Sequence, residues 1–344
     1  MLLPATSRAP RVRSAVPSGR SPFPARRSLG ILGVQYRFQP DLHRSAVQRR
    51  CSRVSPLRVP LVLCLLAVLP AATCGSQYRL PACAQQTTAP LVELPAGTQR
   101  LEVQFHDGLL TLETGPLSCE LQIHLVADAP ATVAQLASEV LPSMEVSGQT
   151  TKLQVSVPAG ASLDAVRTTW RLRAPAGTAV VARTRRGAVV ARGAACNLEV
   201  HGGSGVIEAQ MAGGSAQLTS SSGSVILRGD YPFADVRSEL GRIDLRLPDH
   251  DRRDCEVRVV SKNDVYIDLH RTQLFDFLYF GEERLVHCDP EVRVQWQRNE
   301  TVDGVDYLRG RLGDLAGERG GQLRLDAMGP VYVRLQPEGA VAAN

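Results

Sequence analysis

Four glycines that lie 18 residues apart constrain the fold of this chain more than any other feature: Gly187, Gly205, Gly223 and Gly241. Around each glycine, the residues seven and five positions before it and two and four positions after it are all apolar. These sixteen residues are Val180, Ala182, Val189, Ala191, Leu198, Val200, Ile207, Ala209, Ala216, Leu218, Val225, Leu227, Ala234, Val236, Ile243 and Leu245. Because only 44% of the chain is hydrophobic, this agreement indicates a structural repeat.

The two-residue spacing of the apolar positions predicts β-strands, since alternate side chains of a strand point to the same face. Each unit is expected to be a strand, a turn and a second strand, with the glycine in the turn, where a positive φ costs it little. Small or hydroxylated residues that suit a strand end lie three positions before the glycines: Thr184, Gly202, Ser220 and Ser238.

A rigid period is typical of coils that stack and bury their apolar faces against each other. We therefore predict an all-β fold, a β-solenoid of the β-helix kind with 18-residue coils. Its regular coils should cover residues 178–247 within a single β-repeat domain at 85–344. The alternative is an antiparallel β meander or sandwich, in which the same alternation places one face of a sheet on a core.

Less regular segments flank the repeat. The apolar frame recurs around Gly108, so the domain should already open with a related unit. Residues 131–145 have apolar spacing closer to that of a helix. Residues 270–320 break the repeat, and we expect them to cap an open end of the solenoid rather than to form a binding surface. Most of the aromatic residues of the C-terminal half belong to this segment: Phe275, Phe277, Tyr279, Phe280, Trp296 and Tyr307.

Residues 1–84 are interpreted as a basic leader and signal peptide. The first 60 residues contain twelve Arg and one acidic residue, Asp41, whereas the rest of the chain holds 27 basic and 33 acidic residues. No nucleic-acid partner is therefore expected downstream of the leader. The apolar run at 59–72 is short for a bilayer span and suits a signal-peptide core. It predicts export to the periplasm, the cell surface or the medium, with a start site placed too early; the alternative is an organellar transit peptide.

Two processing routes compete at the end of the leader. Ala82-Cys83-Ala84 fits the small-x-small pattern of signal peptidase, which would release a chain that begins at Gln85. Leu80-Pro81-Ala82-Cys83 instead resembles a bacterial lipobox, in which Cys83 would be lipidated. We favour soluble release, so contact with a membrane is expected only through the signal peptide or a lipid anchor.

The motifs that could be catalytic or bind phosphate have structural explanations. His106-Asp107-Gly108 fits a turn, and the glycine-rich stretch from His201 to Gly205 joins strand to strand without the helix and Lys of a P-loop. No catalytic residue, cofactor or metal site is therefore predicted. Four downstream cysteines allow one or two disulfides, and none lies in a Cys-x-x-Cys motif: Cys119, Cys196, Cys255 and Cys288.

One outward column could bind a ligand. Stacking would align the residues five positions after the glycines, and a ladder of guanidinium groups can bind an acidic glycan or a phosphate. The members are Arg192, Gln210, Arg228 and Arg246. The default interpretation is local ion pairing, because carboxylates such as Glu208 and Asp244 lie two positions back.

The repeat also resembles a known family. The stretches T-R-R-G-A-V-V-A-R-G, G-G-S-G-V-I-E-A, S-S-S-G-S-V-I-L-R-G and S-E-L-G-R-I-D-L-R-L, with W-R-L-R-A-P-A-G before them, are similar to the bacterial "putative adhesin" domain of unknown function. The resemblance covers roughly residues 92–269. It implies a right-handed β-helix-like scaffold in an envelope or exported protein, and it transfers no functional residue.

These observations together predict a non-enzymatic, exported β-repeat protein that serves as a rigid binding or adhesion scaffold at the cell envelope. Its partner would be an envelope glycan or another envelope protein. One alternative is a carbohydrate-active enzyme that uses Asp235, Asp244 and Arg246 from successive coils. Another is a structural protein whose coil ends stack between molecules.

Overall fold

The computed structural model describes residues 84–248, 255–302, 305–313 and 318–336, all within the unit Gly75–Asn344. The interpretations placed on residues 1–83, Cys83 included, lie outside the described part. Strands dominate this described part and form two sheets of 12 strands each there. Within these residues the helical elements are α1 (Pro130–Glu139) and two short 3₁₀ turns, η1 (Leu163–Ala165) and η2 (Glu283–Leu285).

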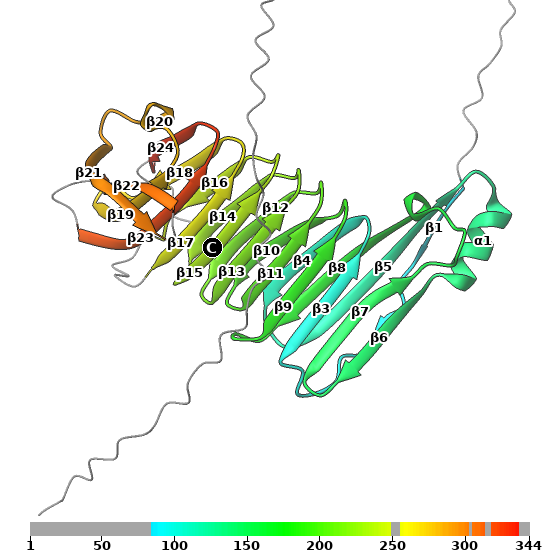
Figure 1. Cartoon of the computed structure of the whole chain (residues 1–344). Helices are drawn as coiled ribbons and strands as arrows, with labels where there is room; N and C mark the ends of the chain where they lie inside the picture. The colour runs from blue at the N-terminus through cyan, green and yellow to red at the C-terminus, as the bar shows by residue number, and fades with distance from the viewer. Residues whose placement is uncertain (1–83, 249–254, 303–304, 314–317, 337–344) are drawn as a thin grey trace, which may run out of the picture. The chain divides into compact units, whose positions relative to one another are not determined.

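Sheet A is built around a run of parallel strands (Figure 1). In spatial order its main path is β1 (Ala84–Thr88), β5 (Ser118–Ala127), β8 (Val166–Ala174), β4 (Gly108–Thr114), β10 (Ala188–Ala194), β12 (Ile207–Ala212), β14 (Val225–Asp230), β16 (Ile243–Arg246), β18 (Val265–Leu269), β24 (Val331–Leu335) and β20 (Val286–Cys288). The short β2 (Leu91–Val92) pairs with β5.

Sheet B has the same design. In spatial order it consists of β21 (Arg293–Val302), β22 (Val305–Gly313), β19 (Gln273–Phe280), β23 (Glu318–Ala327), β17 (Glu256–Ser261), β15 (Phe233–Ser238), β13 (Ser215–Ser220), β11 (Asn197–Gly202), β9 (Ala179–Thr184), β3 (Arg100–Phe105), β7 (Thr150–Ser156) and β6 (Leu141–Ser147). Antiparallel pairs occur only towards its two ends among the described strands, at β6 with β7, β19 with β22 and β21 with β22.

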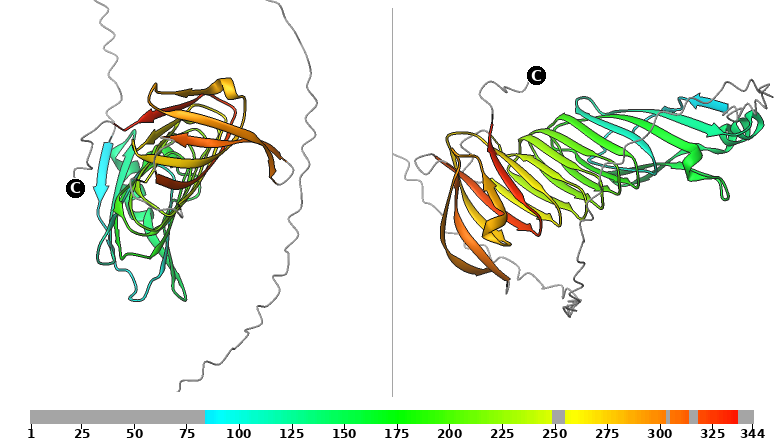
Figure 2. Two further views of the ribbon diagram at one scale, coloured as in Figure 1. Left: turned by 90° about the vertical axis from the view of Figure 1, so that its left-hand side faces the viewer. Right: turned by 90° about the horizontal axis from the view of Figure 1, so that it is seen from above.

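The chain alternates between the two sheets, so that one strand of each makes a coil, and Figure 2 shows successive coils stacked on one another. Ile207 pairs with Val225, and Val225 pairs with Ile243. On the other sheet Leu198 pairs with Ala216, which pairs with Ala234. The predicted β-solenoid is confirmed, and the antiparallel meander is wrong for the repeat because these strands are parallel.

The core lies between the two sheets and consists of the apolar columns that the repeat predicts. All sixteen apolar residues of the four units are at most 1% exposed. Like side chains stack along the column from strand to strand, about 4.8 Å apart. The burial of these aliphatic side chains, each favourable by roughly 1.5–3 kcal/mol for a Val or Leu, stabilises the stack.

The repeat glycines lie in the turns, as predicted, but for a different physical reason. Their φ angles are not among the positive ones. A Cβ on Gly223 would lie 1.9 Å from the carbonyl oxygen of Gly205, and a Cβ on Gly205 would lie 2.0 Å from that of Gly187. Successive turns therefore touch backbone to backbone, and this close approach requires glycine.

Both ends of the stack are formed by excursions of the chain that the period does not reveal. Leu110 of the Gly108 unit pairs directly with Val189, although residues 115–174 lie between the two strands in the sequence. Those residues form β5, α1, β6, β7 and β8, which lie beyond β3 and β4. At the other end β17 pairs with β23, so the final coil is inserted between the earlier coils and the excursion of β19 to β22.

The excursions also contain the helix and the aromatic segment. The predicted helix at 131–145 is confirmed for Pro130–Glu139, but residues 141–145 belong to strand β6. Of the predicted capping residues, Phe275, Phe277 and Tyr279 are completely buried and Phe280 is 41% exposed. Trp296 packs against Phe277 and Tyr279, with ring centroids 5.6 and 6.2 Å apart.

Candidate functional site

A groove of about 740 Å³ lies at the C-terminal ends of several strands of sheet B. One wall is formed by the last residues of β3, β7, β9, β11 and β13 and by the turns that follow them. The other wall is formed by the loop 157–165, which contains η1 and joins β7 to β8. This long loop stands where the regular coils have only a tight turn, so the groove exists because the coil is irregular here.

A polar column follows the length of the groove. Gln104 pairs in register with Arg183, Arg183 with His201, and His201 with Thr219. Gln154 extends the column on the other side of Gln104. These side chains alternate along their strands with buried core residues, so they point outward. All five line the groove.

Two groups in the groove have no side-chain partner within the described part of the chain, the guanidinium of Arg185 and the imidazole of His106. Arg185 is exposed, and its main-chain carbonyl accepts a hydrogen bond from the N–H of Ser204 at 2.9 Å. The main-chain carbonyl of His106 likewise accepts a hydrogen bond from the N–H of Arg186 at 2.8 Å. Turn contacts thus hold both backbones while both side chains remain available for a ligand.

Glu199 partly neutralises the positive column. Its carboxylate lies 2.7 Å from His201 Nε2, 3.9 Å from Arg183 and 3.7 Å from Arg100. The hydrogen bond from His201, followed by attraction to the nearby cations, lowers the pKa of Glu199. The carboxylate is therefore ionised at neutral pH, and it orients the His201 ring beside Arg183.

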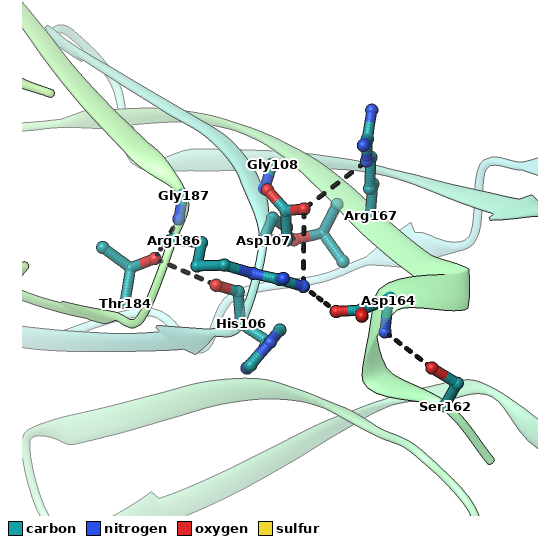
Figure 3. Close-up of polar contacts among 10 residues, drawn as sticks. His106, Asp107, Gly108, Ser162, Asp164, Arg167, Thr184, Arg186 and Gly187 are labelled. Carbon is teal, nitrogen blue, oxygen red and sulfur yellow. Dashed lines mark hydrogen bonds and ion pairs between the residues drawn. The ribbon is translucent and has the colours of Figure 1, made fainter. Parts of the chain in front are cut away.

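A set of ion pairs holds the loop 157–165 beside the turns (Figure 3). Arg186 lies between two carboxylates: it contacts Asp164 of η1 and lies 4.0 Å from Asp107. Asp107 also faces Arg167 at 3.4 Å and accepts a hydrogen bond from the N–H of Gly108 at 2.7 Å. Ser162 accepts a hydrogen bond from the N–H of Asp164 at 3.3 Å. Asp107 is therefore engaged in structural contacts, and the predicted turn at 106–108 is confirmed.

The arrangement can bind an anion. Arg183 and Arg185 offer guanidinium groups, which bind carboxylate or phosphate through two parallel hydrogen bonds. Thr184 and Ser220 do not contribute, because their hydroxyls are used in the turns: Gly187 N–H donates to Thr184 Oγ1 at 2.8 Å and Ser220 Oγ donates to the Gly223 carbonyl at 2.7 Å. Sequence reasoning missed the groove, although the basic run at 183–186 was a signal for it.

The residues suggested for an enzymatic alternative do not meet. Asp235 lies on β15 of sheet B, whereas Asp244 and Arg246 lie on β16 of sheet A. Asp235 is paired with Arg237 at 2.6 Å, and Asp244 with Arg242 at 2.5 Å. A glycoside hydrolase needs two carboxyl groups that flank one bond, roughly 5–9.5 Å apart. These two aspartates extend from different sheets and do not form such a pair.

The predicted arginine ladder is only partly continuous. Gln210 and Arg228 pair in register, but between β10 and β12 the register shifts from Ala191 to Ala194, so Arg192 and Gln210 are not paired. On the other side of β10, Arg192 pairs with Glu113 of β4. Arg246 pairs in register with Asp268. Asp268 in turn lies 2.7 Å from Arg334, and its burial raises its pKa. Ligand binding by Arg192, Arg228 and Arg246 stays a prediction.

The cysteines downstream of the leader do not fulfil the expectation of disulfides. Cys119, Cys196, Cys255 and Cys288 form no disulfide with one another. They lie in β5, before β11, before β17 and in β20, and three of them are buried. Burial raises the pKa of Cys119 to about 12 and those of Cys196 and Cys288 to about 11, so these thiols are protonated at neutral pH.

Within the residues that the structure describes, no three His, Cys, Asp or Glu side chains gather as metal ligands would. In the same part of the chain, no helix has the length and apolar character needed to cross a bilayer.

The fold therefore defines the chain as a β-solenoid protein with two parallel-stranded sheets. No family model and no curated protein matches the sequence. Among solved structures, a "putative cell adhesion protein" from Clostridium sporogenes is 12% identical, covers 74% of this chain and 100% of its own, and has a TM-score of 0.30.

Two further solved structures cover similar shares of the chain. A "putative adhesin" from Bacteroides fragilis is 11% identical, covers 74% of this chain and 99% of its own, and has a TM-score of 0.33. A "putative lipid binding protein" from Parabacteroides distasonis is 12% identical, covers 72% and 96%, and has a TM-score of 0.35. Two of these three bacterial proteins are named as adhesion proteins and the third as a lipid binding protein, and at these TM-scores the names identify no ligand for this chain.

Proposed function

We propose that this protein is a non-enzymatic, exported scaffold that binds an acidic glycan of the cell envelope in the groove beside β9. The observation that carries the proposal is the uncommitted guanidinium of Arg185, which lies in a hollow with Arg183 and a column of polar side chains. The stacked coils, the separation of Asp235 from Asp244 and the signal-peptide core predicted from the sequence at 59–72 support it.

The chemistry of the groove favours a polyanion over a neutral sugar. Uronic or phosphorylated sugars present anionic oxygens to which arginine binds in a planar, bidentate geometry. Gln104, Gln154 and Thr219 add hydrogen-bonding groups in line with the arginines, and these can bind hydroxyl groups along an extended chain. Val155, Val157 and Leu163 supply an apolar wall for the faces of sugar rings.

The test compares Arg185→Ala with Arg228→Ala, an exposed arginine on the other sheet. Binding of polygalacturonate and of neutral dextran to the protein, as its host produces it, is measured by calorimetry at two salt concentrations. Loss of one charge-assisted contact, about 1.5–3 kcal/mol, should weaken polygalacturonate binding by roughly tenfold or more in Arg185→Ala. Arg228→Ala should bind like the unaltered protein.

The same samples separate the alternatives. Shortening of the polysaccharide over time would overturn the non-enzymatic proposal. Equal binding of dextran and polygalacturonate would exclude charge recognition. A defect confined to Arg228→Ala would move the binding surface to the arginine ladder of sheet A.

A further inference from the structure

The two sheet edges at the end of the stack formed by β1 and β6 differ in chemistry. The sheet A edge, β1, exposes Gln85, Gln86 and Thr87, and α1 packs beside it. The sheet B edge, β6, exposes apolar side chains instead: Leu141 is 56%, Met144 47% and Val146 50% exposed. An exposed apolar edge strand is a template for pairing with another strand, because its backbone groups have no neighbour on one side.

Two of these side chains, Met144 and Val146, lie on the core side of the sheet, whereas Leu141 lies on the opposite face. Met144 is paired with Leu153 and Val146 with Thr151, and both partners are at most 1% exposed. Directly paired residues point to the same face. A small cavity of about 200 Å³, lined by Met144, Leu153 and the buried Trp170 among others, opens at this place. The interior of the stack is therefore not closed at β6.

We propose that β6 pairs with β6 of a second copy of this chain, antiparallel and across a twofold axis at Met144. In this register Met144 faces Met144 of the second copy and Val146 faces Pro142, so apolar residues meet on the core side. Glu145, the only charged residue of β6, faces Ser143. No like charges oppose each other, and β6 of each copy becomes an interior strand of a continuous sheet.

The other end of the stack makes a closed pair the expected assembly. There β19, β22 and β21 extend sheet B, and Phe275, Phe277 and Tyr279 are buried within them. An isologous contact at one end uses the same patch on both copies and therefore stops at two. The pair would hold two copies of the groove on one assembly, which would strengthen binding to a polymeric ligand.

Introducing a charge at Met144, on the proposed twofold axis, tests the pairing. Sedimentation velocity of the unaltered protein over a wide concentration range should show a monomer and dimer in exchange. Met144→Lys places two ammonium groups opposite each other, and Met144→Glu two carboxylates, so each variant alone should be monomeric. An equimolar mixture of the two variants should dimerise again, because Lys then faces Glu. Met328→Lys, at a 69% exposed residue near the other end, should dimerise normally.

Each other outcome overturns the proposal. A concentration-independent monomer shows that β6 does not pair, and a dimer that survives Met144→Lys places the contact elsewhere. Species that grow beyond the dimer indicate end-to-end stacking. A mixture that stays monomeric excludes the register at Met144.

A separate control is thermal unfolding. Unchanged unfolding of both Met144 variants shows that they remain folded, as expected at a half-exposed site.

Discussion

At the scale of single residues, the glycine column shows how one atom decides whether coils can stack. None of Gly187, Gly205, Gly223 and Gly241 has a positive φ, yet the last three leave no room for a Cβ against the carbonyl of the preceding turn. In Gly187 the obstacle is the ring of Phe105 at 2.1 Å. The period of the sequence thus reflects contact between turns as well as the alternation of the core.

Gly223→Ala should destabilise the protein. The added methyl group would lie 1.9 Å from the Gly205 carbonyl oxygen, so the two turns must separate. Overpacking of a close contact costs about 1–3 kcal/mol. Urea unfolding followed by circular dichroism measures the loss. Gly115→Ala is the control, since its Cβ would meet only the Arg173 side chain at 3.4 Å; an equal loss in both variants would contradict the explanation.

At the scale of elements, the loop 157–165 is the part on which the groove depends. The loop pairs with no described strand, and the contact of Arg186 with Asp164 attaches it to the turns. Val155 and Val166, which lie on the strands on either side of the loop, line the groove. Exposed ion pairs contribute little to global stability, about 0–1 kcal/mol, but they can fix a loop. Local mobility of the loop and stability of the fold should therefore respond differently to mutation.

Arg186→Ala should loosen this loop without unfolding the protein. Hydrogen exchange at the amides of residues 159–165 is expected to become faster, because the contacts of Arg186 with Asp164 and Asp107 are lost. The unfolding free energy should fall by no more than about 1 kcal/mol. Arg173→Ala, which removes an exposed pair with Glu113 on sheet A, is the matched control. Unchanged exchange in the loop would show that other contacts hold it.

At the scale of the whole molecule, the final coil is placed between earlier coils and the aromatic excursion. We propose that β19 to β22 close this end of the stack. Val265 pairs with Val331, so β24 continues the column that Val189 and Ile207 begin. The final coil, although later in the sequence, therefore lies between the earlier coils and the excursion of β19 to β22.

Phe277→Ala should be among the most destabilising changes in the chain. Phe277 is completely buried and packs against Tyr279 at 5.9 Å and Trp296 at 5.6 Å. Removal of a buried Phe side chain costs about 3–5 kcal/mol. Guanidinium unfolding monitored by fluorescence measures the loss, with Phe280→Ala, at a 41% exposed residue, as the control. A loss below that of Phe280→Ala would show that the excursion does not stabilise the stack.

The sequence by itself determined the repeat, the all-β class and the identity of the core columns. Val189, Ile207, Val225 and Ile243 could be assigned to one column because adjacent coils contact each other residue by residue, so their contacts recur at a fixed spacing. The turn at 106–108 and the helix beginning near residue 131 were also predictable, since both are set by local pattern.

Only the tertiary structure decided what the excursions do. It placed Leu110 beside Val189, assigned Asp235 and Asp244 to different sheets, and brought the loop 157–165 beside Arg183 and Arg185. Such contacts join segments of very different separation, and each occurs once. They depend on which strand edge is left unpaired after the coils have stacked, and a periodic pattern contains no information about that choice.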